Sequence, residues 1–297
     1  MYNNIVKYEN GNYIVFFNLN NGTKIRETND DEFIPSFAEG VDMKITDKCD
    51  GGCAFCYEGC TPNGKHGDIL NYKFLDTLRP YTELAINGND MSHPDLIPFL
   101  MKLKEKKVIV NMTVNQLHFE RHQDLIRKLV DDKLIYGLGI SLKNPTEEFV
   151  ALVKTYPNAV IHVINGIVGP ADIGILADND LKILILGYKL LRRGVDHYST
   201  HYENIEALQY WLKENLEEMI EHFKVISFDN LAITQLDVRR LMSEKDWKEF
   251  YMGDDGKYTF YLDMVEGTYG KNSLSTERYP IEDDIVTMFE KIRLQKK

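Results

Sequence analysis

All four cysteines of the chain, Cys49, Cys53, Cys56 and Cys60, lie within one segment of twelve residues. Disulfide frameworks distribute their cysteines along a chain, because bridges stabilise most when they close long loops. Cysteines crowded into one segment are typical of metal sites in a reducing compartment, so we expect a thiolate-bound metal and a cytoplasmic location. Thiolates are soft ligands that select zinc, copper(I) or iron–sulfur clusters.

Two glycines occupy the first cysteine interval, which reads Cys49-Asp-Gly-Gly-Cys53 and is followed by Ala-Phe-Cys56. The glycines allow the backbone to wrap closely around a bulky inorganic group. The segment directly follows a strand expected at 41–46, and loops at the carboxyl ends of parallel strands carry the chemistry of α/β enzymes. The cysteine segment is therefore the first candidate for a functional site.

The spacing C-x3-C-x-aromatic-C, formed by Cys49, Cys53, Phe55 and Cys56, resembles the signature of the radical S-adenosylmethionine superfamily over roughly residues 41–190. The resemblance implies that Cys49, Cys53 and Cys56 bind three irons of a [4Fe-4S] cluster and leave the fourth iron open to S-adenosylmethionine, with Phe55 beside the cofactor. It further implies that a flavodoxin-type or ferredoxin-type reductant supplies an electron that cleaves this cofactor. The resulting 5′-deoxyadenosyl radical then abstracts hydrogen from a substrate.

A second segment, Asn87-Gly-Asn-Asp-Met-Ser-His-Pro94, resembles the superfamily's Gly-Gly-Glu-Pro segment, which contacts the methionine amino group of the cofactor. Asn87, Asn89 and Asp90 depart from that pattern, although an asparagine amide oxygen can still accept an N–H bond. The resemblance also implies that polar residues at strand ends hold the ribose and the carboxylate, and that a backbone segment flanks the adenine. The implied cofactor contacts are Gly88, Asn89, Asp90, Asn115, Ser141, Lys143, Asn165, Leu186 and Gly187.

A closed metal site is the alternative interpretation, with Cys60 or His66 as a fourth ligand beside Cys49, Cys53 and Cys56. Such a site would hold a structural zinc ion or a sealed iron–sulfur cluster in a non-catalytic binding protein, because a catalytic metal keeps an open position. Structural zinc sites usually pair two ligand knuckles across a longer span, whereas all candidates here share one loop. Replacing Cys60 by alanine separates the two interpretations, since only a four-thiolate site should lose its metal.

The elements that must position these residues alternate between short apolar runs and helical patterns. Strands are expected at 41–46, 83–86, 108–114, 134–141, 159–164 and 182–186. Helices are expected between them at about 68–79, 94–106, 119–131, 146–155 and 171–178. Repeated strand–helix–strand units build a parallel sheet through right-handed crossovers, so the predicted fold class is α/β, a partial (β/α)6 TIM-like barrel.

Both ends of the chain are predicted to extend this barrel. Strand-like segments at 13–17 and 23–27 flank Asn21-Gly22, a hairpin turn signal, and predict a small N-terminal β-hairpin. Apolar residues at helical spacing over 205–223 predict a long helix that packs on the core. The expected parts are the hairpin extension at 1–40, the barrel at 41–200 and a mixed C-terminal extension at 201–297.

The C-terminal part mixes strand signals at 225–228 and 258–265 with short helices. We expect at least half of its aromatic residues to pack in the core. The segment as a whole is expected to close the open side of the barrel and to contact the substrate. Its candidate residues are Tyr258, Phe260, Tyr261, Tyr269 and Arg278.

Composition and charge limit the partners that the chain can bind. The net charge of −11 argues against duplex nucleic acid, because duplex binding rests on clustered lysine and arginine. No apolar run reaches the length of about 18 residues that a membrane span needs. No cysteine follows residue 60, which argues against auxiliary clusters. We expect a small metabolite, a nucleotide or a peptide as substrate, and no catalytic residue is assigned.

Overall fold

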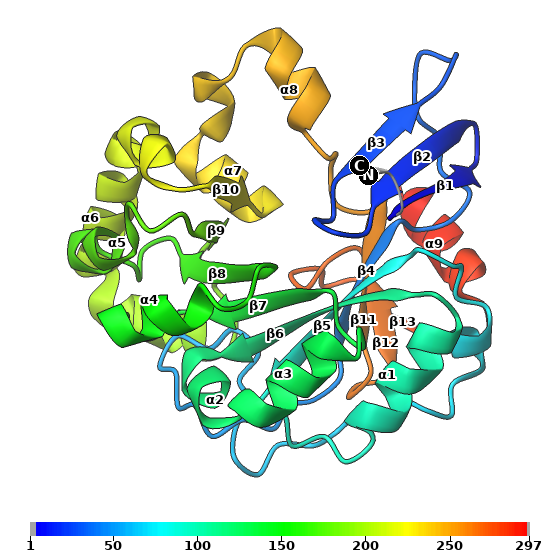
Figure 1. Cartoon of the computed structure of the whole chain (residues 1–297), viewed down its shortest axis with the longest axis horizontal. Coiled ribbons are helices and arrows are strands. Elements are labelled where there is room, and N and C mark those ends of the chain that lie inside the picture. Colours follow the sequence, from blue (N-terminus) through cyan, green and yellow to red (C-terminus); the bar gives the residue numbers. More distant parts are fainter. Residues whose placement is uncertain (1–3, 296–297) are drawn as a thin grey trace.

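The computed structural model describes residues 4–295, most of which form one curved sheet with helices along its outer side (Figure 1). The strands of this sheet are β4 (Gly40–Lys44), β5 (Glu83–Asn89), β6 (Ile109–Asn115), β7 (Gly137–Ser141), β8 (Ala159–Ile164), β9 (Lys182–Leu186), β10 (Val225–Phe228), β11 (Thr259–Asp263), β12 (Thr268–Gly270) and β13 (Tyr279–Pro280). They lie in the order β10-β9-β8-β7-β6-β5-β4-β11-β12-β13. All neighbours from β10 to β11 pair in parallel, and β12 and β13 are added by antiparallel pairing.

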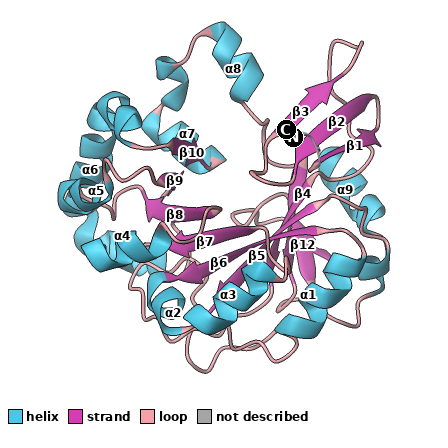
Figure 2. Cartoon of the chain, viewed as in Figure 1, coloured by secondary structure: helices cyan, strands magenta, loops and turns pink. Residues whose placement is uncertain are grey.

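The helices are α1 (Leu96–Glu105), α2 (Gln116–Arg121), α3 (Gln123–Asp131), α4 (Glu147–Val153), α5 (Pro170–Leu176), α6 (Arg193–Met219), α7 (Asn230–Leu236), α8 (Glu244–Phe250) and α9 (Ile285–Arg293). Short 3-10 turns form η1 (Lys73–Asp76), η2 (Ile220–His222) and η3 (Val238–Leu241). Figure 2 shows α1 to α6 and α9 around the outer side of the curved sheet. Apolar side chains of the strands pack there against the helices in the main core.

The six strands predicted for the barrel are all present and lie side by side as β4 to β9. The predicted α/β class with a parallel sheet is therefore confirmed. The number of parallel strands is larger than the six predicted, because β10 pairs in parallel with β9 and β11 pairs in parallel with β4. The strand order of the described residues begins at β10 and ends at β13, so the sheet is curved but open.

Two helix predictions were wrong in extent. Residues 68–79 contain only the turn η1, because the Asp68 carboxylate accepts two following backbone N–H groups at 3.1 and 3.0 Å. Such side-chain bonds compete with helical ones. The helix expected at 119–131 is divided into α2 and α3 at His122, whose φ of −113° and ψ of 34° are not helical. Asn115 makes α2 begin earlier than expected, since its side chain accepts a first-turn N–H at 3.0 Å.

The N-terminal segment forms a separate antiparallel sheet of β1 (Ile5–Asn10), β2 (Tyr13–Asn18) and β3 (Lys24–Glu27). The predicted hairpin is confirmed as β2–β3, and Gly22 in its turn has a positive φ of 80°. The prediction missed β1, because most of its side chains are exposed or half-buried and its sequence lacks a clear apolar alternation.

This small sheet covers the amino-terminal end of the large one. Tyr13, Val15 and Phe17 of β2 share a core with Ile109, the first residue of β6, and with Tyr258, which precedes β11. The carboxyl ends of the parallel strands lie at the opposite end of the large sheet. Chemistry on this fold is therefore expected at the end that the small sheet does not cover.

A buried ion pair joins the small sheet to the large one. Glu39, just before β4, accepts hydrogen bonds from the Arg26 guanidinium at 2.7 and 3.0 Å and from the Tyr13 hydroxyl at 2.5 Å. Lys24 of β3 pairs with Glu83 of β5 at 2.7 Å. A bidentate arginine–carboxylate pair fixes orientation as well as distance, so it holds β3 in one position against the large sheet.

The helix α6 begins shortly after β9 and has a kink at His201. Its buried residues, among them Leu212, Leu216 and Met219, confirm the apolar face predicted over 205–223. The division of the chain into three parts at residues 40 and 200 stays a prediction. None of the helices within residues 4–295 is long and apolar enough to cross a membrane.

Candidate metal centre

The cysteine loop, residues 45–61, follows β4 and lies at the carboxyl end of the parallel strands. Backbone bonds fold it back on itself, because the Cys49 N–H donates to the Thr61 carbonyl at 2.9 Å and the Asp47 N–H donates to the Lys65 carbonyl at 2.8 Å. Gly52 has a φ of 65°, a conformation that glycine adopts without strain. The loop therefore holds its cysteines where sequence analysis expected them, directly after the first strand of the barrel.

The sulfur atoms of the loop receive hydrogen bonds from its surroundings. Cys60 is 5% exposed, and the other three cysteines are half-buried. The Gly51 N–H donates to the Cys49 sulfur at 3.4 Å, and the side-chain amide of Asn115 donates to the Cys53 sulfur at 3.5 Å. Donors of this kind favour the thiolate, which is the form that binds metals.

The four thiols differ in their tendency to ionise. Burial raises the pKa of Cys49 to about 11 and also raises the pKa of Cys53. A hydrogen bond from the Cys60 thiol lowers the pKa of Cys56, and the same bond raises the pKa of Cys60. Metal binding at these cysteines requires the thiolate form, so it is coupled to the release of protons.

Three cationic side chains hold carbonyl groups of the cysteine loop. The Lys143 ammonium donates to the Gly51 carbonyl at 3.0 Å. The Arg193 guanidinium donates to the carbonyls of two cysteines at 3.1 and 2.9 Å, and Arg192 donates to a further loop carbonyl. Positive charge beside cysteines favours their thiolate form. Lys143 was predicted as a cofactor contact, but both arginines were missed, and their adjacent positions shortly after the sixth strand were the available signal.

Asp50 ties the cysteine loop to α2. Its carboxylate accepts hydrogen bonds from Nε2 of the buried His118 and from Nη1 of Arg121, the latter at 3.1 Å. These two bonds lower the pKa of Asp50 to about 2, so the carboxylate is ionised at neutral pH. Neither partner on α2 was predicted, although a spacing of three residues places both on one face of a helix.

The two asparagines that depart from the Gly-Gly-Glu-Pro pattern bind the cysteine loop itself. Asn87 accepts the Ile45 N–H at 2.7 Å and donates to the Thr46 carbonyl at 3.0 Å. Asn89 donates to the same carbonyl at 3.2 Å and to the Cys60 sulfur at 3.3 Å. The departure thus has a structural reason, because these amides join the end of β5 to the loop.

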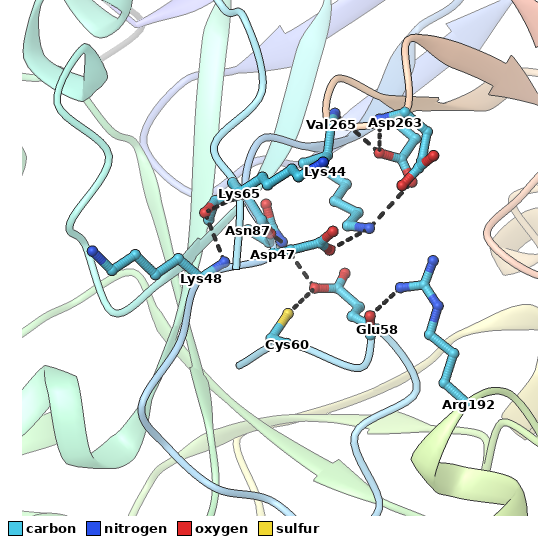
Figure 3. A network of polar contacts seen from close by, with 12 residues as sticks. Lys44, Asp47, Lys48, Glu58, Cys60, Lys65, Asn87, Arg192, Asp263 and Val265 are labelled. Carbon is cyan, nitrogen blue, oxygen red and sulfur yellow. Dashed lines mark hydrogen bonds and ion pairs between the residues drawn. The ribbon is translucent and has the colours of Figure 1, made fainter. Parts of the chain in front are cut away.

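A buried polar network lies beside the loop (Figure 3). Lys44, at the end of β4, pairs with Asp47 at 2.5 Å and with Asp263 at 3.2 Å. Glu58 accepts a hydrogen bond from Asn87 at 2.8 Å, and burial raises the pKa of Glu58. Since Asp263 ends β11, the network fixes the start of the cysteine loop to two neighbouring strands.

Other predicted cofactor contacts lie near the loop or at the adjacent strand ends. Ser141 pairs in register with Asn115 on one side and with His162 on the other. The Phe55 ring lies beside α6, with its centroid 5.9 Å from that of His197. These positions place the end of β7 next to the asparagine that donates to Cys53.

Two predicted contacts, Gly88 and Asp90, interact with neighbouring parts of the protein at the end of β5. Gly88 lies against β6, where an added Cβ would come 2.9 Å from the Met112 side chain. The Asp90 carboxylate accepts the Ser92 hydroxyl at 2.6 Å and the Ser92 N–H at 3.1 Å. Asp90 therefore stabilises the turn that follows β5.

Asn165, Leu186 and Gly187 form a second group at the ends of β8 and β9. The buried Asn165 amide donates to Gln235 at 3.1 Å, while its Oδ1 atom has no hydrogen-bond partner. The Asn165 N–H donates to the Leu186 carbonyl at 2.9 Å, and the Gly187 N–H donates to Asp229 at 2.9 Å. The structure thus divides the predicted contacts between the cysteine loop and this second group.

The residues of the cysteine loop fit an iron–sulfur cluster. Three thiols, N–H donors at two sulfurs and nearby cations form a donor set and a setting suited to a negatively charged cluster. At Gly51 an added Cβ would come 3.2 Å from the Cys49 sulfur, so glycine leaves room there for a bulky group. Within the described residues, no three His, Cys, Asp or Glu side chains converge on a site for a single metal ion.

Comparison with known proteins identifies solved structures of similar fold. No family model and no curated protein matches the sequence. The structure of Streptococcus suis SuiB bound to S-adenosylmethionine is similar at 12% identity and a TM-score of 0.59, over 99% of this chain and 90% of that chain. SuiB bound to precursor peptide SuiA is similar at 13% identity and a TM-score of 0.62, over 99% and 90% of the two chains. The chain therefore shares its fold with SuiB over almost its whole length.

Proposed function

We propose that the chain is a radical S-adenosylmethionine enzyme that acts on a peptide. The observation that carries the proposal is the cysteine loop, in which Cys49, Cys53 and Cys56 follow the carboxyl end of β4 as free thiols. The structure of SuiB with S-adenosylmethionine supports the choice of cofactor, and the structure of SuiB with a precursor peptide supports the choice of substrate.

The chemistry supplied by a bound [4Fe-4S] cluster is the transfer of one electron to S-adenosylmethionine, which gives methionine and a 5′-deoxyadenosyl radical that takes a hydrogen atom from the substrate. Cys49, Cys53 and Cys56 are the proposed ligands, and an external flavodoxin-type or ferredoxin-type protein is the proposed reductant. Lys143 and Arg193 place positive charge beside the thiolates, since they donate to loop carbonyls at 2.9 to 3.1 Å.

The proposed cofactor contacts belong to the two groups described above. Asn115 donates to the sulfur of Cys53, a proposed cluster ligand, at 3.5 Å, and Asn89 donates to the sulfur of Cys60 in the same loop at 3.3 Å. The remaining proposed contacts are Phe55, Gly88, Asp90, Ser141, Lys143, Asn165, Leu186 and Gly187. The small N-terminal sheet covers the opposite end of the strands and leaves the carboxyl ends free for the cofactor and substrate.

Electron paramagnetic resonance tests the proposal. The protein is purified without oxygen, reconstituted with iron and sulfide, reduced, and measured with and without S-adenosylmethionine. We expect a [4Fe-4S]⁺ signal that shifts on addition of the cofactor, followed by release of 5′-deoxyadenosine. Cys56→Ala should lose the cluster, and Cys60→Ala is the matched control that should retain it. A signal that does not respond to the cofactor, or loss of the metal in Cys60→Ala, would indicate a sealed site on four cysteines and refute the proposal.

A further inference from the structure

Lys189, Arg192 and Arg278 form a cluster of cations near Tyr57 and Tyr261. All three form hydrogen bonds only to neutral oxygen atoms within residues 4–295. The Lys189 ammonium donates to the Ser273 hydroxyl at 3.1 Å, and Nη2 of Arg278 donates to the Ser273 carbonyl at 2.9 Å. Arg192 donates to a carbonyl of the cysteine loop. Charged side chains that are partly buried normally find a partner of opposite charge. Lys189 and Arg278 are half-buried and Arg192 beside them is exposed, so the two half-buried cations indicate an anionic ligand.

Arg278 has an N–H group that lacks an acceptor. Its Cζ atom lies 4.7 Å from the centre of the Tyr261 ring, and its Nη1 atom is buried without a hydrogen-bond partner. At Gly270 of β12 an added Cβ would come 2.8 Å from Nη1, so this glycine makes room for the guanidinium. A buried N–H without an acceptor costs free energy that a bound acceptor would recover.

Tyr261 faces the concave side of the sheet. Its neighbours Phe260 and Leu262 belong to the main core on the helix-covered side, and side chains alternate between the two faces of a strand. Burial raises the pKa of Tyr261, while the charges of Arg278 and Arg192 lower it. Both guanidinium groups therefore lie near the phenol on the open face of the sheet.

These cations border the cysteine loop. The Lys189 ammonium lies 4.2 Å from the centre of the Tyr57 ring, one residue after the last proposed ligand. Figure 3 shows the Arg192 side chain extending toward Glu58 in the space near Asp263. A group bound by the three cations would thus lie next to the proposed cluster and cofactor.

The carboxylates of this region do not neutralise the cations. Asp263 pairs with Lys44 at 3.2 Å, and Glu58 accepts an amide N–H at 2.8 Å. Asp42 is exposed, and the charge of Lys189 acts on its carboxylate from beyond ion-pair distance. Because nearby carboxylates offset part of the positive charge, the region suits a monoanion better than a dianionic phosphate.

We propose that Lys189, Arg192 and Arg278 form a subsite that binds a carboxylate of the peptide substrate. The inference rests on the proposed function for its substrate class. A guanidinium binds a carboxylate through two parallel N–H bonds, which would give Nη1 of Arg278 its missing acceptor. The carboxylate belongs either to an acidic side chain or to the C-terminus of the peptide.

Peptide binding to the reconstituted protein, measured by isothermal titration calorimetry without a reductant, tests this subsite. The probes are acetyl-Ala-Glu-Ala-amide, its glutamine analogue, and acetyl-Ala-Ala-Ala with a free C-terminus. We expect one of the two acidic peptides to bind at least about tenfold more tightly than the glutamine peptide, which corresponds to about 1.4 kcal/mol. Preference for the glutamate peptide assigns the subsite to a side chain, and preference for the free acid assigns it to the C-terminus.

Arg278→Gln should abolish this preference, and Arg278→Lys, which keeps the charge, should retain part of it. The matched control is Arg127→Gln, because Arg127 also stacks on a tyrosine, at 3.8 Å from the Tyr156 ring centre, but belongs to α3. Equal binding of all three peptides, a preference that survives in Arg278→Gln, or stronger competition by inorganic phosphate than by acetate would overturn the inference. A carboxylate preference without 5′-deoxyadenosine release supports the subsite and refutes the proposed function. Release of 5′-deoxyadenosine without a carboxylate preference supports the proposed function and refutes the subsite.

Discussion

Replacing Lys44 by methionine tests how strongly the buried network beside the cysteine loop stabilises the fold. Lys44 is 2% exposed, and its ammonium lies 2.5 Å from Asp47 and 3.2 Å from Asp263. With an effective dielectric constant of about 20, a pair at 3.2 Å gains about 5 kcal/mol of attraction, which offsets the cost of burying the two charges. Methionine keeps most of the apolar length of the side chain and removes the charge.

Removal of one member of a buried ion pair costs about 3–5 kcal/mol, because the remaining charge stays buried without its partner. We therefore expect Lys44→Met to lower the free energy of unfolding by about 3–5 kcal/mol, measured by urea unfolding followed by circular dichroism. Lys73→Met is the control, because the Lys73–Asp283 pair has exposed side chains, and its unfolding midpoint should hardly change.

The double variant Lys44→Met/Asp263→Asn separates charge from packing. Asp263 accepts the N–H groups of Val265 and Glu266 at 3.1 and 3.0 Å, and an asparagine oxygen can still accept both. In Lys44→Met the Asp263 carboxylate is left without its partner, and Asp263→Asn removes that unpaired charge. The double variant should therefore be about 1–3 kcal/mol more stable than the sum of the two single effects predicts. A loss below about 1 kcal/mol in Lys44→Met, or strict additivity in the double variant, would refute the reasoning.

Three other positions give independent tests. Burial lowers the pKa of His162 to about 4, below its value in the unfolded chain. As the pH falls from 7 to 4, the free energy of unfolding should therefore decrease by about 2–3 kcal/mol relative to that of His162→Gln. A difference between the two proteins that stays constant with pH in urea unfolding would contradict this. Glu39→Gln leaves its buried arginine partner without a counter-charge, so the same assay should show a loss of about 3 kcal/mol, and a loss below about 1 kcal/mol would argue against the pair. At Gly64 an added Cβ would lie 2.1 Å from the Asp47 carbonyl oxygen, so Gly64→Ala should reduce the iron bound after reconstitution. Gly174→Ala, where a Cβ meets open space on α5, should leave iron binding unchanged, and equal iron content in the two variants would contradict this placement of the loop.

Local patterns were sufficient where neighbouring residues alone decide the structure. Apolar runs identified β4 to β9, and the hairpin turn signal identified β2–β3, because strands and tight turns depend on residues close in sequence. The same reasoning failed at 68–79, where an apolar pattern predicted a helix and the Asp68 side chain captures the N–H groups that a helix would need. Two competing hydrogen bonds to one side chain leave little trace in the periodicity of the sequence.

In the candidate site, too, residues close in sequence could be predicted and long-range contacts could not. The cysteine spacing alone predicts a thiolate metal site after the first barrel strand, since ligands that share one loop need no distant partner. The contacts of the cations with that loop could not be predicted, because Arg193 and Lys143 reach its carbonyl groups across 140 and 92 residues of sequence. Lys143 was expected at the cofactor, and Arg193 was not expected at all. Pairing over such separations depends on the order of the strands and on the packing of α6, which a linear pattern does not encode.

The sequence by itself predicted a thiolate metal site and identified most elements of the sheet, since both depend on residue types and short spacings. Only the tertiary structure decided what surrounds the centre. It bound Asn87 and Asn89 to the cysteine loop, and it left Nη1 of Arg278 buried without an acceptor next to Tyr261. The physical reason is that hydrogen bonds and charge interactions act over a few ångströms in space, whatever the distance along the chain.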